Sequence, residues 1–334
     1  MTQRNDATGG PRLSRRALLP AGLALAGATR PAAAQGRYPD RPVRVIVNYS
    51  PGGGADSVAR IVFARLSERL GQPFVIENRP GGSGTIGASV VAHAAPDGYT
   101  IMHEATAFTV NPTFLPHLPF DPERDFRPVY HAVMIPVVLS VNPRSPIRSA
   151  ADVIARAKAN PNGLNCGSAG IGSGQHIALE MFARQAGIRL NHVPYRGGAP
   201  MLSDLIGGQL DLAFDNLAGA ANHAKAGAIR MVAHGAPERL PMLPDLPAIA
   251  ETLPGFAAAD WNGVVAPGKT PDAIVALLNR ELAATMAEPA VAEKLARLNI
   301  VPVPPSSPEA FGAFLREQTA KWGDIIRAAN IRPE

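Results

Sequence analysis

Two spacings of apolar residues alternate along this chain, one typical of buried strands and the other of amphipathic helices. The β-branched run from Val43 to Val47 predicts a strand. Apolar residues three and four positions apart then predict a helix from Asp56 to Leu70, which Gly71 ends as a C-cap. The same order of strand, turn and helix recurs in the rest of the chain.

Alternation of this kind predicts an α/β fold whose mainly parallel sheets carry helices on both faces. Further strands are expected at residues 74–78, 99–103, 137–141, 164–166, 191–195, 210–215, 229–234 and 261–266. Further helices are expected at residues 88–93, 150–159, 175–186, 199–207, 220–226, 271–287, 289–298 and 307–329. Prolines crowd residues 111–128 and 237–255, which we expect to be irregular surface connections.

These elements divide into two lobes, at residues 35–138 and 139–255. The helices after residue 255 have no sheet of their own to cover, so we expect residues 256–334 to return to the first lobe. The chain would then cross between the lobes near Ser140 and near Asn262. Such crossings would leave a cleft between the lobes and act as a hinge.

Two glycine-rich turns, residues 52–54 and 172–174, each join a strand to a helix. A helix N-terminus has unpaired N–H groups and the positive end of the helix dipole, so each turn is suited to bind an anion. We therefore predict that a ligand carboxylate lies between the two helix N-termini. Ser173 is also a good N-cap for the second helix.

The first 34 residues have the features of an export signal. Arg15 and Arg16 precede an apolar stretch too short to span a bilayer, and residues 32–34 are alanines that offer a cleavage site. We expect a periplasmic protein whose leader, residues 1–34, is cleaved near Ala34. The paired arginines suit the twin-arginine route, but an ordinary general secretory signal fits as well.

Charge is nearly balanced outside this leader. The whole chain has a net charge of +5, but residues 1–34 hold five arginines and one acid, so the remainder has 27 basic and 26 acidic residues. No basic cluster interleaved with aromatic residues remains, which argues against nucleic acid as a partner. Cys166 is the only cysteine, so no intrachain disulfide can form, and we expect it to be a small core residue.

A series of short motifs accompanies the two turns. In chain order they are Tyr38-Pro39 with Arg41-Pro42, Pro51-Gly52-Gly53 with Asp56, Glu77-Asn78-Arg79-Pro80-Gly81, Gly84 with Gly87, Pro96-Asp97-Gly98-Tyr99-Thr100, Gly167-Ser168-Ala169-Gly170 with Gly172-Ser173 and His176, Val193-Pro194-Tyr195-Arg196-Gly197, and Gly207-Gly208-Gln209-Leu210-Asp211. This series resembles the substrate-binding receptors of tripartite tricarboxylate transporters, also called Bug proteins, and covers the whole chain after the leader.

The resemblance implies a two-lobed periplasmic binding protein fold of type II and a receptor rather than an enzyme. Such a receptor closes on a small carboxylate, of the organic acid or amino acid type, and delivers it to integral membrane transporter subunits in a transient contact. We expect a monomer that uses no cofactor.

The resemblance also implies which residues face the ligand, since backbone N–H groups, hydroxyls and waters hold the carboxylate between the two glycine turns in this family. At the matching positions of the first lobe stand Tyr49, Ser50, Gly52, Gly53, Asp56 and Thr106. Those of the second lobe are Ser168, Ala169, Gly170, Ser173, Tyr195, Arg196 and Asp215.

Some of these positions leave alternatives open. Asp56 and Ser173 would also serve as helix caps, and His176 would either stack beneath the ligand or pack on its own lobe. After the strand at 99–103 the family often has a Ser/Thr-Asn pair, whereas this chain has Glu104-Ala105-Thr106. Glu104 would favour a ligand with a cationic or hydroxylated tail.

One motif supports a different function. Gly82, Gly84 and Gly87 have the spacing of a dinucleotide fingerprint, and Glu104 ends the following strand as the ribose-binding acid of such a site would. A dinucleotide-binding oxidoreductase is therefore the alternative, disfavoured because Arg79-Pro80 separates the motif from the strand. The histidines show no paired metal-ligand spacing and no G-x-S-x-G motif occurs, so we predict neither a metal site nor catalytic residues.

Overall fold

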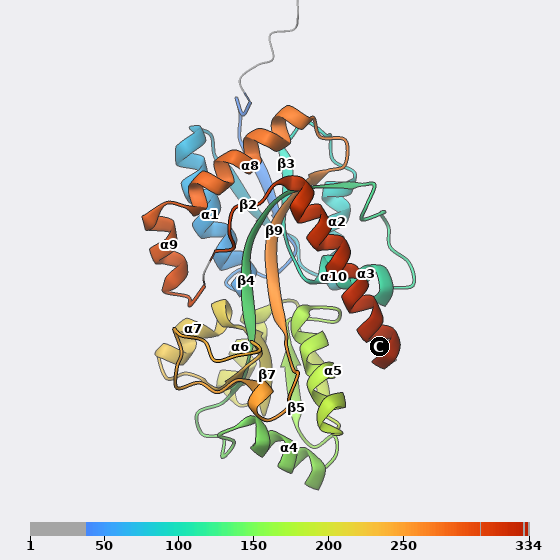
Figure 1. Ribbon diagram of the computed structural model, residues 1–334, viewed down its shortest axis with the longest axis vertical. Helices are drawn as coiled ribbons and strands as arrows, with labels where there is room; N and C mark the ends of the chain where they lie inside the picture. The colour runs from blue at the N-terminus through green and yellow to red at the C-terminus, as the bar shows by residue number, and fades with distance from the viewer. Residues whose placement is uncertain (1–37, 301, 330, 333–334) are drawn as a thin grey trace, which may run out of the picture. The chain divides into compact units, whose positions relative to one another are not determined.

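The computed structural model describes residues 38–300, 302–329 and 331–332. The expected leader, residues 1–34, lies outside this part of the chain. The described residues form a mixed α/β fold built on two sheets that share one long strand (Figure 1). None of the helices in this part of the chain is long and apolar enough to cross a membrane.

The first sheet has the order β2-β1-β3-β9-β4. Its parallel part consists of β2 (Phe74–Asn78), β1 (Val43–Val47) and β3 (Thr100–Ala105). Strand β9 (Ala259–Pro267) comes from near the end of the chain and lies antiparallel between β3 and the first part of β4 (Phe126–Val141). We call the elements built on this sheet lobe 1.

The second sheet begins where the pairing of β4 changes. Residues up to Pro136 pair with β9, whereas Val137 and the residues after it pair with β7 (Leu212–Asn216) and β8 (Arg230–His234). Strands β5 (Asn165–Ser168) and β6 (Asn191–Pro194) extend this sheet in parallel with β7. We call the elements built on this sheet lobe 2; β4 enters it and β9 leaves it, so the fold is two-lobed with two strand crossings.

The strand expected at residues 137–141 is only the end of β4, which begins at Phe126. The expectation of an irregular chain up to residue 128 was wrong for this reason, because Pro128 and Pro136 lie within the strand. Proline lacks a backbone N–H and is tolerated in an edge strand. The first part of β4 is such an edge, since among the named strands of the described residues it pairs with β9 alone.

Helices cover both sheets and follow the strands closely. Lobe 1 contains α1 (Gly54–Leu70), the 3₁₀ turn η1 (Gly82–Gly84), α2 (Thr85–Ala92) and α3 (Ala107–Phe114), and lobe 2 contains α4 (Ala150–Ala159), α5 (Gly174–Ala186), α6 (Gly198–Gly207), α7 (Leu217–Lys225) and the 3₁₀ turn η2 (Ile249–Glu251). Helix α3 includes Pro112, so the proline-rich connection is irregular only after Phe114. Buried apolar residues such as Val58, Phe63 and Leu66 on α1 show why these segments are helical, since their spacing puts them on one face.

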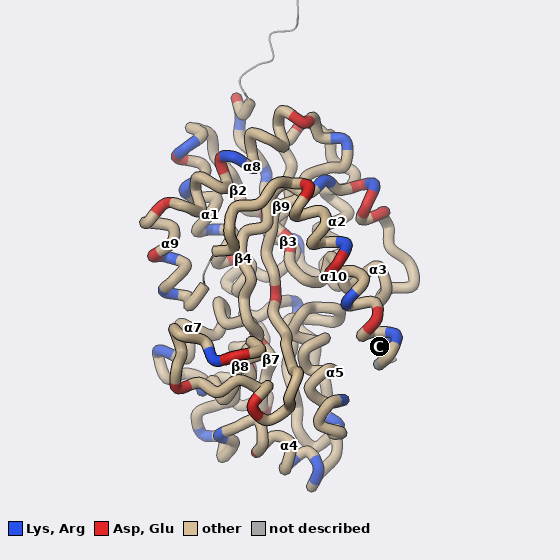
Figure 2. The backbone as a smooth tube through the Cα atoms, in the orientation of Figure 1, with Lys and Arg blue, Asp and Glu red and all other residues tan. Residues whose placement is uncertain are grey.

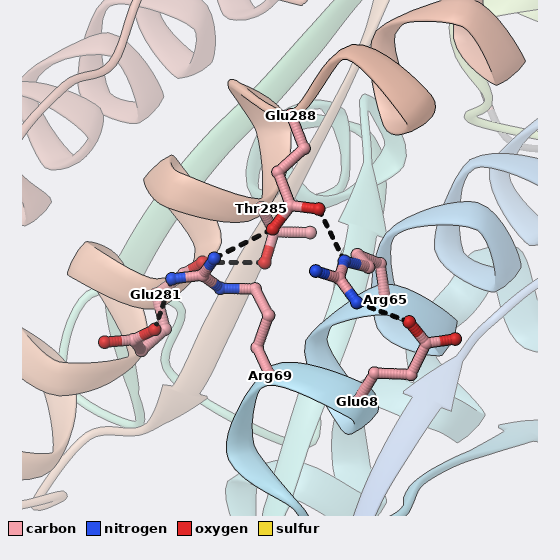
Figure 3. A network of polar contacts seen from close by, with 6 residues as sticks. All are labelled: Arg65, Glu68, Arg69, Glu281, Thr285 and Glu288. Carbon is pink, nitrogen blue, oxygen red and sulfur yellow. Dashed lines mark hydrogen bonds and ion pairs between the residues drawn. The ribbon is translucent and has the colours of Figure 1, made fainter.

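The last helices are α8 (Asp272–Met286), α9 (Pro289–Ala296) and α10 (Pro308–Ala329). Helices α8 and α9 pack against α1, and α10 packs against α3 and β4. A cluster of ion pairs connects α1 with α8 and α9: Arg69 binds Glu281 and Glu288, and Arg65 binds Glu288 (Figure 3). Basic and acidic positions are interspersed along these helices (Figure 2).

Candidate functional site

A cleft of about 290 Å³ opens between the carboxyl ends of strands from both lobes. This is the sheet edge at which α/β proteins place their ligands. Its lobe 1 wall consists of Asn48, Tyr49, Gly81, Gly82, Ser83, Gly84 and Ala107, and its lobe 2 wall of Ala169, Gly170, Ile171, Ser173, Pro194, Tyr195 and Arg196.

Six of the residues that we expected at the site line this cleft. They are Tyr49, Ala169, Gly170, Ser173, Tyr195 and Arg196. Ser173 combines two roles, because its hydroxyl accepts a hydrogen bond from the N–H of His176 (3.2 Å) as the N-cap of α5 while the residue faces the cleft. The N-terminus of α5 is therefore part of the cleft wall.

A much smaller cavity, of about 10 Å³, lies where the first residues of several helices meet. Gly53, Gly54 and Ala55 line it from the start of α1, and Gln175, Gly198 and Asn216 line it from the starts of α5, α6 and α7. It also contains two further expected site residues, Gly53 and Asp215. Its volume suits about one water molecule. Tyr49 and Ala169 line both this cavity and the cleft.

The structure does not bring Asp56 to either cavity. Its buried carboxylate accepts hydrogen bonds from the N–H of Gly52 (2.9 Å), Nε of Arg60 (2.8 Å) and Nδ2 of Asn78 (2.8 Å). Burial alone would raise the pKa of this carboxyl, but these donors outweigh it and lower the pKa. It is also not the N-cap, which is Gly53. Asp56 thus stabilises the first glycine turn through its hydrogen bond with the N–H of Gly52.

Thr106 and Ser168 are likewise buried away from both cavities. The hydroxyl of Thr106 hydrogen-bonds to Asp260, and its oxygen accepts from the N–H of Trp261 (3.2 Å). Oγ of Ser168 lies 2.7 Å from Nε2 of His192 and accepts from the N–H of Gly170 (3.2 Å). Neither residue lines the cleft or the small cavity, and each hydroxyl has a hydrogen-bond partner within the protein.

Ser50 and Gly52 instead form a contact between the lobes. The hydroxyl of Ser50 donates to the carbonyl oxygen of Arg196 (2.6 Å), and its N–H donates to the same oxygen (3.2 Å). A Cβ atom placed on Gly52 would lie 3.7 Å from Cβ of Ala199. In this structure the first glycine turn therefore touches the start of α6 across the mouth of the cleft.

His176 lines neither cavity and packs against rings from both lobes, with Phe114 of α3 at 5.7 Å between the centroids and His192 of its own lobe. Its ring stacks on that of His192 with 4.3 Å between the centroids, and its Nδ1 accepts from the N–H of Gly172 (3.2 Å). Burial, together with the neighbouring His192, lowers the pKa of His176 to about 3, so it is neutral at physiological pH.

The sequence did not single out Asn48 or residues 81–84 for this site. Gly82, Ser83 and Gly84 have φ values of 56°, 54° and 86°, which form a left-handed turn that glycine permits. Nδ2 of Asn111 donates to the carbonyl oxygen of Ser83 (2.8 Å) and holds the turn in place. The available signal was that this glycine run follows β2, whose parallel neighbour β1 leads into the first glycine turn.

Three buried acids lie close to the cavities: Asp215 and Asp260 line the small cavity, and Glu104 is bonded to Asn48 of the cleft wall. Burial raises the pKa of Glu104 to about 8 and that of Asp215 to about 7, and it also raises the pKa of Asp260. Arg196 is the charged residue that lines the cleft itself. Within the part of the chain described here, no group of three or more His, Cys, Asp or Glu side chains is placed to hold a metal ion.

Comparison with known proteins places this geometry in a family. The family model described as "Tripartite tricarboxylate transporter family receptor" matches residues 58–331. The chain belongs to this receptor family. Its motifs and its two-lobed fold thus agree with the resemblance seen in the sequence.

Solved structures of similar proteins share the fold of this receptor. The periplasmic binding protein BugD is 31% identical, with a TM-score of 0.85 over 89% of this chain and 100% of its own. Rpa4515 of R. palustris, solved with adipate, is 37% identical, with a TM-score of 0.86 over 89% and 100%. MatC of Rhodopseudomonas palustris, solved with malate, is 32% identical, with a TM-score of 0.83 over 86% and 100%.

The dinucleotide alternative loses its support in this structure. Glu104, which would have to bind a ribose, is 1% exposed, and its Oε1 accepts a hydrogen bond from Nδ2 of Asn48 (3.0 Å). Gly82 and Gly84 of the motif belong to a left-handed turn and Gly87 lies within α2, in a chain that belongs to a receptor family.

Proposed function

We propose that this receptor binds a small carboxylate of the organic acid or amino acid type in the cleft and delivers it to a membrane transporter of the tripartite tricarboxylate type. The observation that carries the proposal is the cleft itself, whose walls combine the turn at residues 81–84, the loop at residues 169–171, the N-cap of α5 at Ser173 and the residue Arg196. Such walls supply N–H donors and positive potential without a lining acid. Two similar receptors were solved with adipate and with malate.

The carboxylate enters where the cleft and the small cavity meet, beside Tyr49 and Ala169. The start of α1 lines the small cavity, and the start of α5 lines both cavities, which supports a carboxylate held by these two helix N-termini. The small cavity is too narrow for the carboxylate, which lies on the cleft side. N–H donors that are fixed before binding lose little entropy when they bind the ligand.

Ligand release requires the lobes to separate. In our proposal residues 35–138 with 256–334 move against residues 139–255, and the crossings in β4 and β9 act as the hinge. The contacts between the lobes that this motion would change are those of Ser50 with Arg196, of Gly52 with Ala199 and of α1 with α7.

The same proposal covers the setting of the protein. It is exported to the periplasm, its leader is cleaved near Ala34, and it acts as a monomer without catalysing a reaction. Mass spectrometry of protein purified from the periplasm should find an N-terminus near Gln35. A form that retains Met1 and stays in the cytoplasm would contradict export.

Calorimetry with carboxylates and their methyl esters tests the binding site. We expect a small dicarboxylate to bind and its monomethyl and dimethyl esters to bind at least tenfold more weakly, because an ester cannot form charged hydrogen bonds worth roughly 1.5–3 kcal/mol each. Gly53→Pro removes one N–H donor at a residue whose φ of −78° suits proline, so it should weaken binding without unfolding the protein.

Arg79→Ala is the matched control, because Arg79 pairs with Glu77 outside the cleft. It should bind as the wild type does. If no carboxylate binds, or if the esters bind equally well, the proposed function is wrong.

A further inference from the structure

Asn48 is the polar side chain of the lobe 1 wall that the family motifs do not explain. It follows β1, lines the cleft and is only 2% exposed. Its Nδ2 donates to Oε1 of Glu104 (3.0 Å). Its Oδ1 has no hydrogen-bond partner among the described residues. A buried amide oxygen without a partner is costly. Because Asn48 belongs to the cleft wall, a ligand that enters the cleft can supply this partner.

Two glycines of the apparent dinucleotide motif, Gly84 and Gly87, make room for this side chain. A Cβ atom on Gly84 would lie 2.2 Å from Nδ2 of Asn48, and one on Gly87 would lie 2.8 Å from its Cβ. Neither position can carry a side chain while Asn48 stays where it is. The close approach of Asn48 thus explains the glycines at 84 and 87 without a bound pyrophosphate.

In this structure Glu104 accepts from the nitrogen of the amide, as the carbonyl oxygen of a protonated carboxyl also can. Because its Oε1 accepts from the amide nitrogen, the amide oxygen is the atom left over. Burial raises the pKa of Glu104 to about 8; hydrogen bonds from Asn48 and from the N–H groups of Ala105 and Phe108 lower it, and Asp260 raises it. At pH 7 the acid is therefore mostly uncharged and offers little attraction to an ammonium group.

We propose, on the basis of the proposed carboxylate function, that Asn48 determines specificity and selects a carboxylate that carries a hydroxyl group over its deoxy counterpart. A hydroxyl donates a hydrogen bond to the free amide oxygen and needs no counter-charge. A methylene in its place leaves that oxygen unpaired, which is the situation in which binding sites discriminate strongly. Glu104 is a positioning residue that acts through Asn48.

Calorimetry with ligand pairs that differ by one hydroxyl tests this proposal: malate with succinate, lactate with propionate, and citrate with tricarballylate. For at least one pair we expect wild-type protein to bind the hydroxylated member at least tenfold more tightly. Asn48→Leu, which has a similar size and no amide, should reduce that preference to less than threefold by weakening the hydroxylated member alone.

Two variants of Glu104 separate positioning from mere structure. Glu104→Gln keeps an oxygen that accepts from Asn48 and should keep the preference. Glu104→Leu removes the acceptor and should lose the preference while still binding the deoxy acid. Arg79→Ala should match the wild type in every pair, and circular dichroism and thermal melting show whether each variant is folded.

The outcomes distinguish this inference from the proposed function. If carboxylates bind but no pair is discriminated, or if Asn48→Leu keeps the preference, the assignment of Asn48 is wrong and the receptor function stands. A preference for amino over hydroxyl substituents at pH 7 would also overturn the assignment. If no carboxylate binds the wild type, the proposed function fails and the assignment fails with it.

Discussion

At the scale of single residues, Asp215 links the stability of the receptor to pH. Burial, together with the nearby Asp260 and against the hydrogen bond from the N–H of Asn216, raises the pKa of its carboxyl from 3.8 to about 7 in the folded state. A raised pKa means that the folded protein holds a proton that the unfolded chain has released. The stabilisation is therefore complete below about pH 4 and is lost as the pH rises through 7.

We expect Asp215→Asn to flatten this dependence. Between pH 4 and pH 8 the wild type should lose roughly 4 kcal/mol more of its unfolding free energy than the variant, because each tenfold change in proton affinity corresponds to about 1.4 kcal/mol. Asparagine keeps the oxygen that accepts from the N–H of Asn216 (2.8 Å). Urea denaturation at several pH values measures the effect, and parallel curves for the two proteins would contradict it.

Asp56 provides a second test at this scale. Asp56→Ala removes the acceptor of three hydrogen bonds, including that of the Gly52 N–H, and should lower the unfolding free energy by about 2–3 kcal/mol. Asp324→Ala is the control, because its side chain is 79% exposed in a pair with Arg327. Equal stability of the two variants in urea would show that the Asp56 network contributes nothing.

These residues also show how far the sequence predicts the site. The glycine turns and the cap at Ser173 were predictable, because their chemistry depends on neighbours in the chain. The partners of Asp56 and Ser168 were not, since Asn78 and His192 come from other strands. Asn48 was missed for the same reason, because Glu104, which accepts from its amide, is distant in sequence.

At the scale of elements, α1 is joined to α8 and α9 by charged side chains (Figure 3). Glu288 binds both Arg65 and Arg69, so Glu288→Gln leaves two arginines with fewer partners. We expect a lower melting temperature for this variant in dilute buffer and a smaller difference at 1 M salt, where ion pairs are screened. Glu293→Gln, elsewhere on α9, is the control; a difference that does not shrink with salt would rule out an electrostatic cause.

Most elements were predictable from apolar spacing, and the failures have a physical cause. Prolines usually break strands and helices, so residues 111–128 were expected to be irregular. Pro128 is accommodated because β4 is an edge there, and Pro112 lies within the short helix α3 beneath α10. Both depend on tertiary neighbours, which local sequence does not specify.

At the scale of the whole receptor, the contact between Gly52 and Ala199 allows the lobes to be locked. The distance of 3.7 Å between a Cβ on Gly52 and that of Ala199 suits a disulfide. In the double variant Gly52→Cys with Ala199→Cys, oxidation should trap a ligand bound beforehand and exclude one added afterwards. Reduction should restore exchange, which dialysis with a radiolabelled carboxylate measures.

The single variants are the controls for this experiment, because a cysteine at Gly52 is strained by a φ of 83° whether or not a disulfide forms. Cys166 should not interfere, since it is buried and burial raises the pKa of its thiol. Scattering should show that ligand reduces the radius of gyration of the wild type but not of the oxidised variant. Ligand exchange that is equally fast in both redox states would contradict a hinged cleft.

The position of β9 dictates the order in which a newly made chain can fold. This strand lies between β3 and β4, yet it is synthesised after every strand of lobe 2. Lobe 2's sheet needs only residues 137–234 and can form while the chain is still growing. The sheet of lobe 1 cannot be completed until residues 259–267 have been synthesised. Until then β3 lacks one neighbouring strand, and the first part of β4 lacks the strand with which it pairs. A chain that stops before residue 259 would thus form the sheet of lobe 2 but not that of lobe 1. The unpaired strand edges of lobe 1 would be prone to aggregation.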